Sequence, residues 1–138
     1  MVFTILIFST RKPGTTPAEY RAAVEEVVLP FLKDLAGEHF PIKHERYYIQ
    51  RVETPKTEGN TEHNPTTPAV VFVGAQADFD YDSVSTLTFA DQAAFGAYVA
   101  LMQRPENAAS IAEVEGRFLD TSKTSIVPVG EAAVTARE

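Results

Sequence analysis

The stretch FTILIF, at residues 3–8, decides the fold because it is apolar on both of its faces. In a β-strand, successive side chains point to opposite sides, so Leu6 and Phe8 lie on one side, whereas Ile5 and Ile7 lie on the other. A strand with one side in water alternates apolar and polar residues instead. We therefore expect both faces of the sheet that contains this strand to be covered.

The segments that follow predict the order β-α-β, a long loop, and β-α-α-β. The expected elements are a helix from Pro17 to a stop at Gly37, a strand within FPIKHERYYIQRV (40–52), a strand YDSVSTLTF (81–89), helices that begin after Asp91 and at Pro105, and a strand SKTSIVPV (122–129). This order is typical of a ferredoxin-like α+β fold, with a four-stranded antiparallel sheet and helices on one face. No segment is left to cover the other face. We therefore expect a second copy of the chain to cover it, which makes a homodimer and a dimeric α/β barrel.

The first helix carries clear start signals and one interruption. Thr16 is the expected N-cap, Pro17 the first helical residue, and Glu19 the partner in a capping box. Pro30 lies inside the helical pattern and has no amide hydrogen, so we expect a kink or looser turns there.

Composition narrows the class of protein. The chain has 138 residues, a net charge of −7 and no cysteine. We expect one domain over residues 1–129, a mobile polar loop at 53–68 and a flexible tail at 130–138. The negative charge, without a cluster of Lys and Arg, argues against binding to nucleic acid or to an anionic membrane. No metal-ligand spacing is found, and a short apolar start without a basic region or cleavage site predicts a cytoplasmic protein.

Three side chains on one face of the predicted strand at 40–52 are the leading catalytic candidates: His44, Arg46 and Tyr48. A histidine titrates near neutral pH and suits proton transfer, an arginine can hold a carboxylate or phenolate, and a tyrosine can donate to a carbonyl oxygen. The structural alternative is that His44 packs under the helices and hydrogen-bonds a backbone carbonyl. If the two faces are reversed, Tyr47 lines the pocket together with Lys43 and Glu45.

Further candidates lie at the ends of strands. The run ADFDYDS (77–83) places Asp80 and Tyr81 before a strand, where they can contact a substrate hydroxyl. Such a run is more often a solvated turn that hydrogen-bonds its own backbone. His39 follows the helix stop, where it either reaches the mouth of the pocket or lies on the surface.

Four long segments resemble proteins of the EthD-domain family, within the dimeric α/β-barrel superfamily. They are TRKPGTTPAEY (10–20), LAGEHFPIKHERYYI (35–49), GAQADFDYDSVSTLTFAD (74–91) and RPENAASIAEVEGRFLD (104–120). The likeness spans roughly residues 2–129 in the same order. It implies a ferredoxin-like protomer, a dimer and a pocket in each half of the barrel. One departure is Val28, which replaces the histidine of the usual His-x-Pro pattern before Pro30.

The resemblance also implies a function. Members occur in fungal aromatic-polyketide pathways, so we expect a cofactor-independent lyase that decarboxylates or dehydrates an aromatic polyketide-like molecule in secondary metabolism. His44, Arg46 and Tyr48 are the expected catalytic residues. The expected substrate-binding residues are Tyr47, Asp80, Tyr81, His39 and Val28. The alternatives are a cyclase or pericyclase that folds a polyketide-derived chain for ring closure, a dimer that binds an aromatic ligand without turnover, and, by analogy within the superfamily, a cofactor-free oxygenase.

Overall fold

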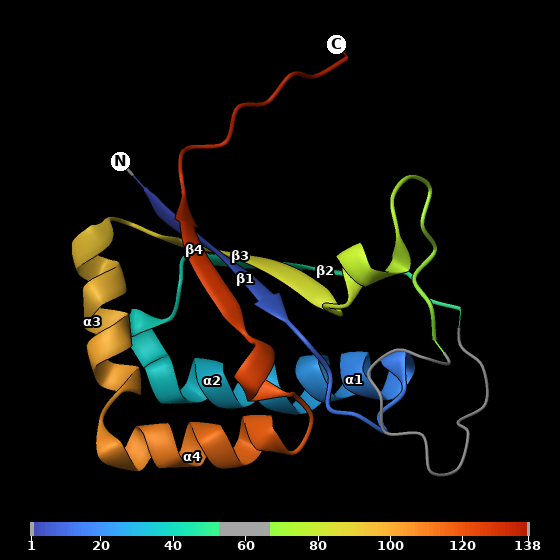
Figure 1. The fold of residues 1–138 in the computed structure, drawn as a ribbon. Coiled ribbons are helices and arrows are strands. Elements are labelled where there is room, and N and C mark those ends of the chain that lie inside the picture. The colour runs from blue at the N-terminus through green and yellow to red at the C-terminus, as the bar shows by residue number, and fades with distance from the viewer. Residues whose placement is uncertain (1, 53–66, 138) are drawn as a thin grey trace.

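The four strands form one antiparallel sheet in the order β2-β3-β1-β4. A computed structural model describes residues 2–52 and 67–137. Its strands are β1 (Phe3–Ser9), β2 (Lys43–Tyr48), β3 (Ser83–Phe89) and β4 (Ser125–Val129). The predicted four-stranded antiparallel α+β sheet is confirmed, and this strand order is the ferredoxin-like one (Figure 1).

The long helices all lie on one face of this sheet (Figure 1). They are α1 (Pro17–Ala23), η1 (Val24–Val28), α2 (Leu29–Ala36), α3 (Gln92–Met102) and α4 (Pro105–Gly116). Three short 3₁₀ turns connect elements: η2 (Gly37–His39), η3 (Gln76–Phe79) and η4 (Thr121–Lys123). Gly130 to Arg137 contains no helix or strand, and its side chains are exposed. The predicted loop at 53–68 lies outside the described residues except for Thr67 and Pro68.

The first helical run begins as its sequence predicts. Thr16 is the N-cap of α1 and accepts a hydrogen bond from the Glu19 amide, while the Glu19 carboxylate accepts from the Thr16 amide. The run then passes through a π-helical turn at η1, just ahead of Pro30. A wider turn of this kind is one way for a helix to accommodate a proline without ending, because proline offers no hydrogen-bond donor. The expected looseness at Pro30 therefore takes the form of a π turn that places Val24 and Val28 against the sheet.

The two faces of the sheet differ in what covers them. Ile5, Leu87 and Phe89 point toward the helices and form the buried core, with Phe95 and Tyr98 of α3 packed against it. The register places His44 opposite Leu87, and Arg46 opposite Ser85, on the same helix-covered face. The opposite face carries Leu6, paired with Thr86 and Val127, and none of the long helices covers it (Figure 1).

A buried ion-pair network fixes one end of the sheet. Asp82 precedes β3, and its carboxylate accepts hydrogen bonds from the amide and Nε of Arg11 and from Nε of Arg51, at 2.8, 3.2 and 3.0 Å. Arg51 also donates to the backbone carbonyls of Phe79 and Tyr81. Charges this deeply buried are retained in proteins when they are paired and hydrogen-bonded. We conclude that Asp82 holds chain segments together and is not available to a ligand.

Candidate functional site

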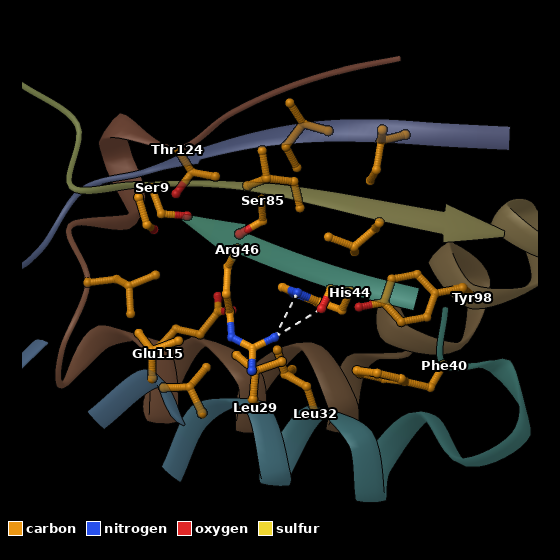
Figure 2. A pocket seen from close by; sticks show the side chains of 18 of the residues that line it. Ser9, Leu29, Leu32, Phe40, His44, Arg46, Ser85, Tyr98, Glu115 and Thr124 are labelled. Carbon is orange, nitrogen blue, oxygen red and sulfur yellow. Dashed lines mark hydrogen bonds between the residues drawn. The ribbon is translucent and has the colours of Figure 1, made fainter. Parts of the chain in front are cut away.

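A cavity of about 270 Å³ lies between the sheet and the helices that cover it. Its lining is mainly apolar, with side chains from all four sheet strands or their ends and from α1, η1, α2, α3 and α4. An apolar hollow with a few polar groups is the usual form of a small-molecule site. Figure 2 shows these polar groups: His44 and Arg46 come from β2, Glu115 from α4, and Tyr98 from α3.

His44 enters this cavity as a neutral imidazole. Its ring stacks on Phe40, with the two ring centroids 6.2 Å apart. Its Nδ1 lies 3.4 Å from Arg46 Nη1, which can only donate, so Nδ1 accepts and Nε2 carries the proton. Burial, and then the positive charge of Arg46, lower the pKa of His44 to about 4. At neutral pH His44 is thus a proton acceptor and a neutral donor rather than an imidazolium acid.

Arg46 is held by a carboxylate from the first helical run. Glu25, on the π turn η1, accepts from Arg46 Nε at 2.5 Å and from Nη2 at 2.7 Å. The hydroxyl of Tyr48 also donates to Glu25, at 2.5 Å. The hydrogen bonds from Arg46 are the main reason why the pKa of Glu25 falls to about 2, whereas burial and the bond to Glu25 raise the pKa of Tyr48. Because Arg46 also donates to the carbonyl and ring of His44, the Glu25–Arg46 pair positions the imidazole.

Glu115 presents a carboxyl group to the cavity without a hydrogen-bond partner in the described part of the chain. Figure 2 shows its side chain reaching from α4 into the hollow. Burial raises the pKa of this carboxyl. Its negative charge also adds to the effect of burial on Tyr98, whose pKa rises to about 12. Glu115 is therefore a group that can hold or release a proton inside the cavity.

Hydroxyl groups line the same end of the cavity as Glu115 (Figure 2). Ser9, Ser85 and Thr124 come from the ends or the interior of three strands. The Tyr20 hydroxyl is 2.8 Å from Ser83 Oγ, and burial raises the pKa of Tyr20 to about 12. The cavity thus has a hydroxyl-rich end and an aromatic end that contains Phe40 and Tyr98.

The structure places the predicted site residues in two groups. His44, Arg46 and Tyr48 share the helix-covered face, and Val28 lines the cavity with only 3% of its surface exposed. Tyr47 points to the opposite face of β2 and is 61% exposed. His44 and Arg46 lie beneath the helices of their own chain, which is the placement of the structural alternative for His44, and they line a cavity there and not a space between two sheets.

The other predicted substrate-binding residues lie outside the cavity lining. His39 is exposed next to Glu38, and Asp80 is exposed just after η3. Tyr81 packs edge to face on Phe8, with the ring centroids 4.9 Å apart. Two residues of the site were not predicted from the sequence: Glu115, which lines the cavity, and Glu25, which holds Arg46. Nothing in the sequence distinguishes Glu115 from its neighbours on α4 before that helix is placed against the sheet.

Neither a metal cluster nor a membrane-spanning segment is found among the described residues. No group of three or more His, Cys, Asp or Glu side chains is arranged there to hold a metal ion. No helix within residues 2–52 and 67–137 is long and apolar enough to cross a membrane.

Comparison with known families gives a specific match. The EthD domain matches residues 12–122, which include the helical run, β2, β3 and α4. The chain belongs to the EthD domain family. Among curated proteins, none matches the chain.

Solved structures agree with this membership at the level of the fold. An EthD family protein from Bacillus halodurans is 11% identical, with a TM-score of 0.52 over 96% of this chain and 100% of that one. The At3g17210 protein from Arabidopsis thaliana is 13% identical, with a TM-score of 0.51 over 97% and 99% of the two chains. SnoaB from Streptomyces nogalater, described as a cofactor-independent oxygenase, is 15% identical with a TM-score of 0.46 over 99% and 97%, too distant to bear on the chemistry of this EthD protein.

Proposed function

We propose that this EthD protein is a cofactor-independent enzyme of secondary metabolism that moves protons on an aromatic, polyketide-like small molecule. The observation that carries the proposal is the cavity itself, an apolar hollow that contains a carboxyl group without a partner and a neutral histidine. In enzymes, the surroundings of such groups shift their pKa values, and these shifts decide which group acts as the acid and which as the base. Here the pKa of the carboxyl is raised and that of the imidazole is lowered, so that the proton resides on Glu115 more readily than on His44.

Decarboxylation of a hydroxylated aromatic acid is the reaction that these groups suit best. The substrate reacts as its phenolate, whose oxygen accepts a hydrogen bond from the Nε2–H of His44. Glu115 protonates the ring carbon that carries the carboxylate, and an electron pair of the phenolate oxygen forms a C=O bond as the ring loses its aromaticity. The bond from that carbon to the carboxylate then breaks, carbon dioxide leaves, and the electron pair of that bond restores the aromatic ring and returns the negative charge to the oxygen. Glu115 is then reprotonated from water. Arg46 acts as a positioning residue, because its guanidinium is paired with Glu25 and fixes the imidazole.

Ring closure is a second candidate, and Val28 favours it. This side chain places a methyl surface in the cavity wall where the family resemblance implies a histidine. A hollow that only folds a flexible chain accelerates closure by proximity and needs no acid at that point. Substitution of Glu115 separates the two reactions, since closure by proximity does not require its proton.

The test uses 1-hydroxy-2-naphthoic acid as a probe substrate, with and without oxygen. We expect the wild-type protein to form 1-naphthol and carbon dioxide equally well in both conditions, and Glu115→Gln to lose at least 100-fold in kcat, in line with removal of a general acid. Glu113→Gln is the matched control, because Glu113 lies on the same helix but is exposed and paired with Arg117. Equal turnover by Glu115→Gln and wild type would contradict the acid role. If wild type and both variants bind the probe but none converts it, the enzyme proposal fails and the alternative of a dimer that only binds an aromatic ligand is supported.

A second copy of the chain is the proposed partner. The helix-free face of the sheet carries Leu6, Phe8 and Val127, and an apolar sheet face of this kind is normally covered. Two such faces together would form the dimeric barrel that the family resemblance implies. Light scattering after size exclusion should give the mass of two chains. Val127→Asp should give one chain, whereas Val73→Asp, at an exposed position outside the sheet, should not.

A further inference from the structure

A second hollow opens on the outer side of the cavity, between the α2 surface and the segment that leads into β2. We call it the outer groove. It has a volume of about 630 Å³, with Pro30, Lys33 and Asp34 on the helix side and Pro41 and Ile42 on the strand side. The inner cavity is smaller, at about 270 Å³. A typical drug-sized ligand site measures about 300–1,000 Å³, so the volume of the inner cavity alone lies just below that range.

The inner cavity and the outer groove meet at four shared side chains: Leu29, Phe40, His44 and Arg46. Phe40 stacks on His44 at this boundary, and Figure 2 shows both beside α2. A molecule in the inner cavity that touches His44 is therefore next to the groove. The four shared side chains form the wall between the two hollows, so a ligand that occupies both has to pass between them.

Half of the residues that line the outer groove are apolar, which gives an uncharged, apolar extension of a ligand a surface to pack on; they are Leu29, Pro30, Phe40, Pro41 and Ile42. The lining has no net formal charge, because the positive charges of Arg46 and Lys33 offset the negative charges of Glu25 and Asp34. Arg46 is already satisfied by Glu25, so it does not attract an anion into the groove. The side chain of Ile42 is 68% exposed, which leaves a large apolar surface available at the rim.

We infer that the substrate is elongated, with its reacting phenolic or carboxylic end in the inner cavity and an uncharged apolar extension in the outer groove. This inference rests on the proposed function, since it assumes that the inner cavity binds the reacting end. It makes Ile42 a specificity-determining residue for the length of the ligand. The reacting end meets Glu115 and His44, and the extension lies between Ile42 and Pro30.

Two phenols that differ only in chain length test the inference by isothermal titration calorimetry: 4-ethylphenol and 4-octylphenol. We expect wild-type protein to bind 4-octylphenol at least tenfold more tightly than 4-ethylphenol. Ile42→Asp should weaken the binding of 4-octylphenol at least tenfold, because an exposed carboxylate replaces the apolar rim, and should change the Kd of 4-ethylphenol less than twofold. Ile42→Ala, a milder change, should weaken the binding of 4-octylphenol about threefold. Val73→Asp is the control, since Val73 lines neither hollow, and should change neither Kd.

The outcomes distinguish the inference from the function on which it rests. If Ile42→Asp leaves the Kd of 4-octylphenol unchanged, or weakens the binding of both phenols equally, the outer groove does not hold the extension and the inference is overturned. The inner cavity then still binds the compact phenol, and the proposed function stands. If neither phenol binds the wild-type protein, both the inference and the proposed function fail.

Discussion

Replacement of Glu115 by glutamine should make the protein more stable at alkaline pH, although it removes a proposed catalytic group. Glu115 faces an apolar cavity and has no hydrogen-bond partner in the described part of the chain, and burial raises the pKa of its carboxyl. The pKa of such a carboxyl is higher in the folded state than in the unfolded state. Below the unfolded pKa the group is protonated in both states, so its ionisation does not lower the free energy of unfolding. As the pH rises, the unfolded chain loses the proton more readily, and the folded state loses stability.

The size of the effect follows from the desolvation of a single group. A buried polar group without a partner costs about 1–3 kcal/mol, and more when it is charged. Because Glu115 borders a hollow that admits water, we take the lower end, about 1 kcal/mol. For a chain of this size that free energy corresponds to a rise of about 4 °C in Tm. Glu115→Gln keeps the shape of the side chain and removes only its charge.

Urea unfolding followed by circular dichroism between pH 4 and pH 8 measures this difference. The free energy of unfolding of Glu115→Gln should exceed that of wild type by about 1 kcal/mol at pH 8, and the two should converge near pH 4. Glu113→Gln carries the same change of charge on the same helix at an exposed position, and its stability should track wild type across this range. A Glu115→Gln protein that is less stable than wild type at every pH would refute the reasoning, because it would mean that the carboxylate has a stabilising partner.

Three further outcomes are expected from the same geometry. The NMR signal of His44, identified by its absence from His44→Gln, should titrate near pH 4. Wild type should lose stability as the pH falls from about 6.5 toward 4, since the unfolded chain binds the His44 proton more tightly than the folded chain does. Titration of this signal near pH 6.5 would contradict a buried neutral imidazole. Glu25→Gln should be less stable than wild type at pH 6, and most of that difference should disappear as the pH falls to 2, because the pKa of Glu25 is lowered to about 2. Exposed Glu26→Gln is the control in the same urea series. Val28→His should lower the free energy of unfolding by about 1–3 kcal/mol in thermal melts, because an imidazole must fit where a buried valine packs; a neutral effect would mean that the cavity accepts a histidine at this point without rearrangement.

Local signals in the sequence were sufficient for the secondary structure and for the grouping of side chains on strands. The cap at Thr16 and Glu19 is formed by the two residues whose types predict it. The period of two along β2 correctly groups His44, Arg46 and Tyr48 on one face. Both results depend only on residues within a few positions of one another, which is the range over which such patterns are reliable.

Tertiary placement was needed to find the rest of the site. The pattern of β2 has polar residues on both faces, so it does not tell which face the helices cover. Glu25 meets Arg46 across 21 positions of sequence, and Glu115 reaches the cavity only because α4 packs beneath the sheet. Asp82 belongs to an acidic run that is typical of a solvated turn, yet Arg11 and Arg51 bury it. Partners so far apart along the chain leave no signal in the spacing of residues.

The central claim is that an aromatic ligand binds beneath the helices, within one chain, rather than on the open face of the sheet. Methyl-labelled protein titrated with 4-ethylphenol and followed by NMR tests it directly. We predict that four methyl signals shift on binding, since their residues line the inner cavity: those of Ile5, Val24, Val28 and Leu32. Shifts confined to Leu6, Val84 and Val127, on the helix-free face, would contradict it.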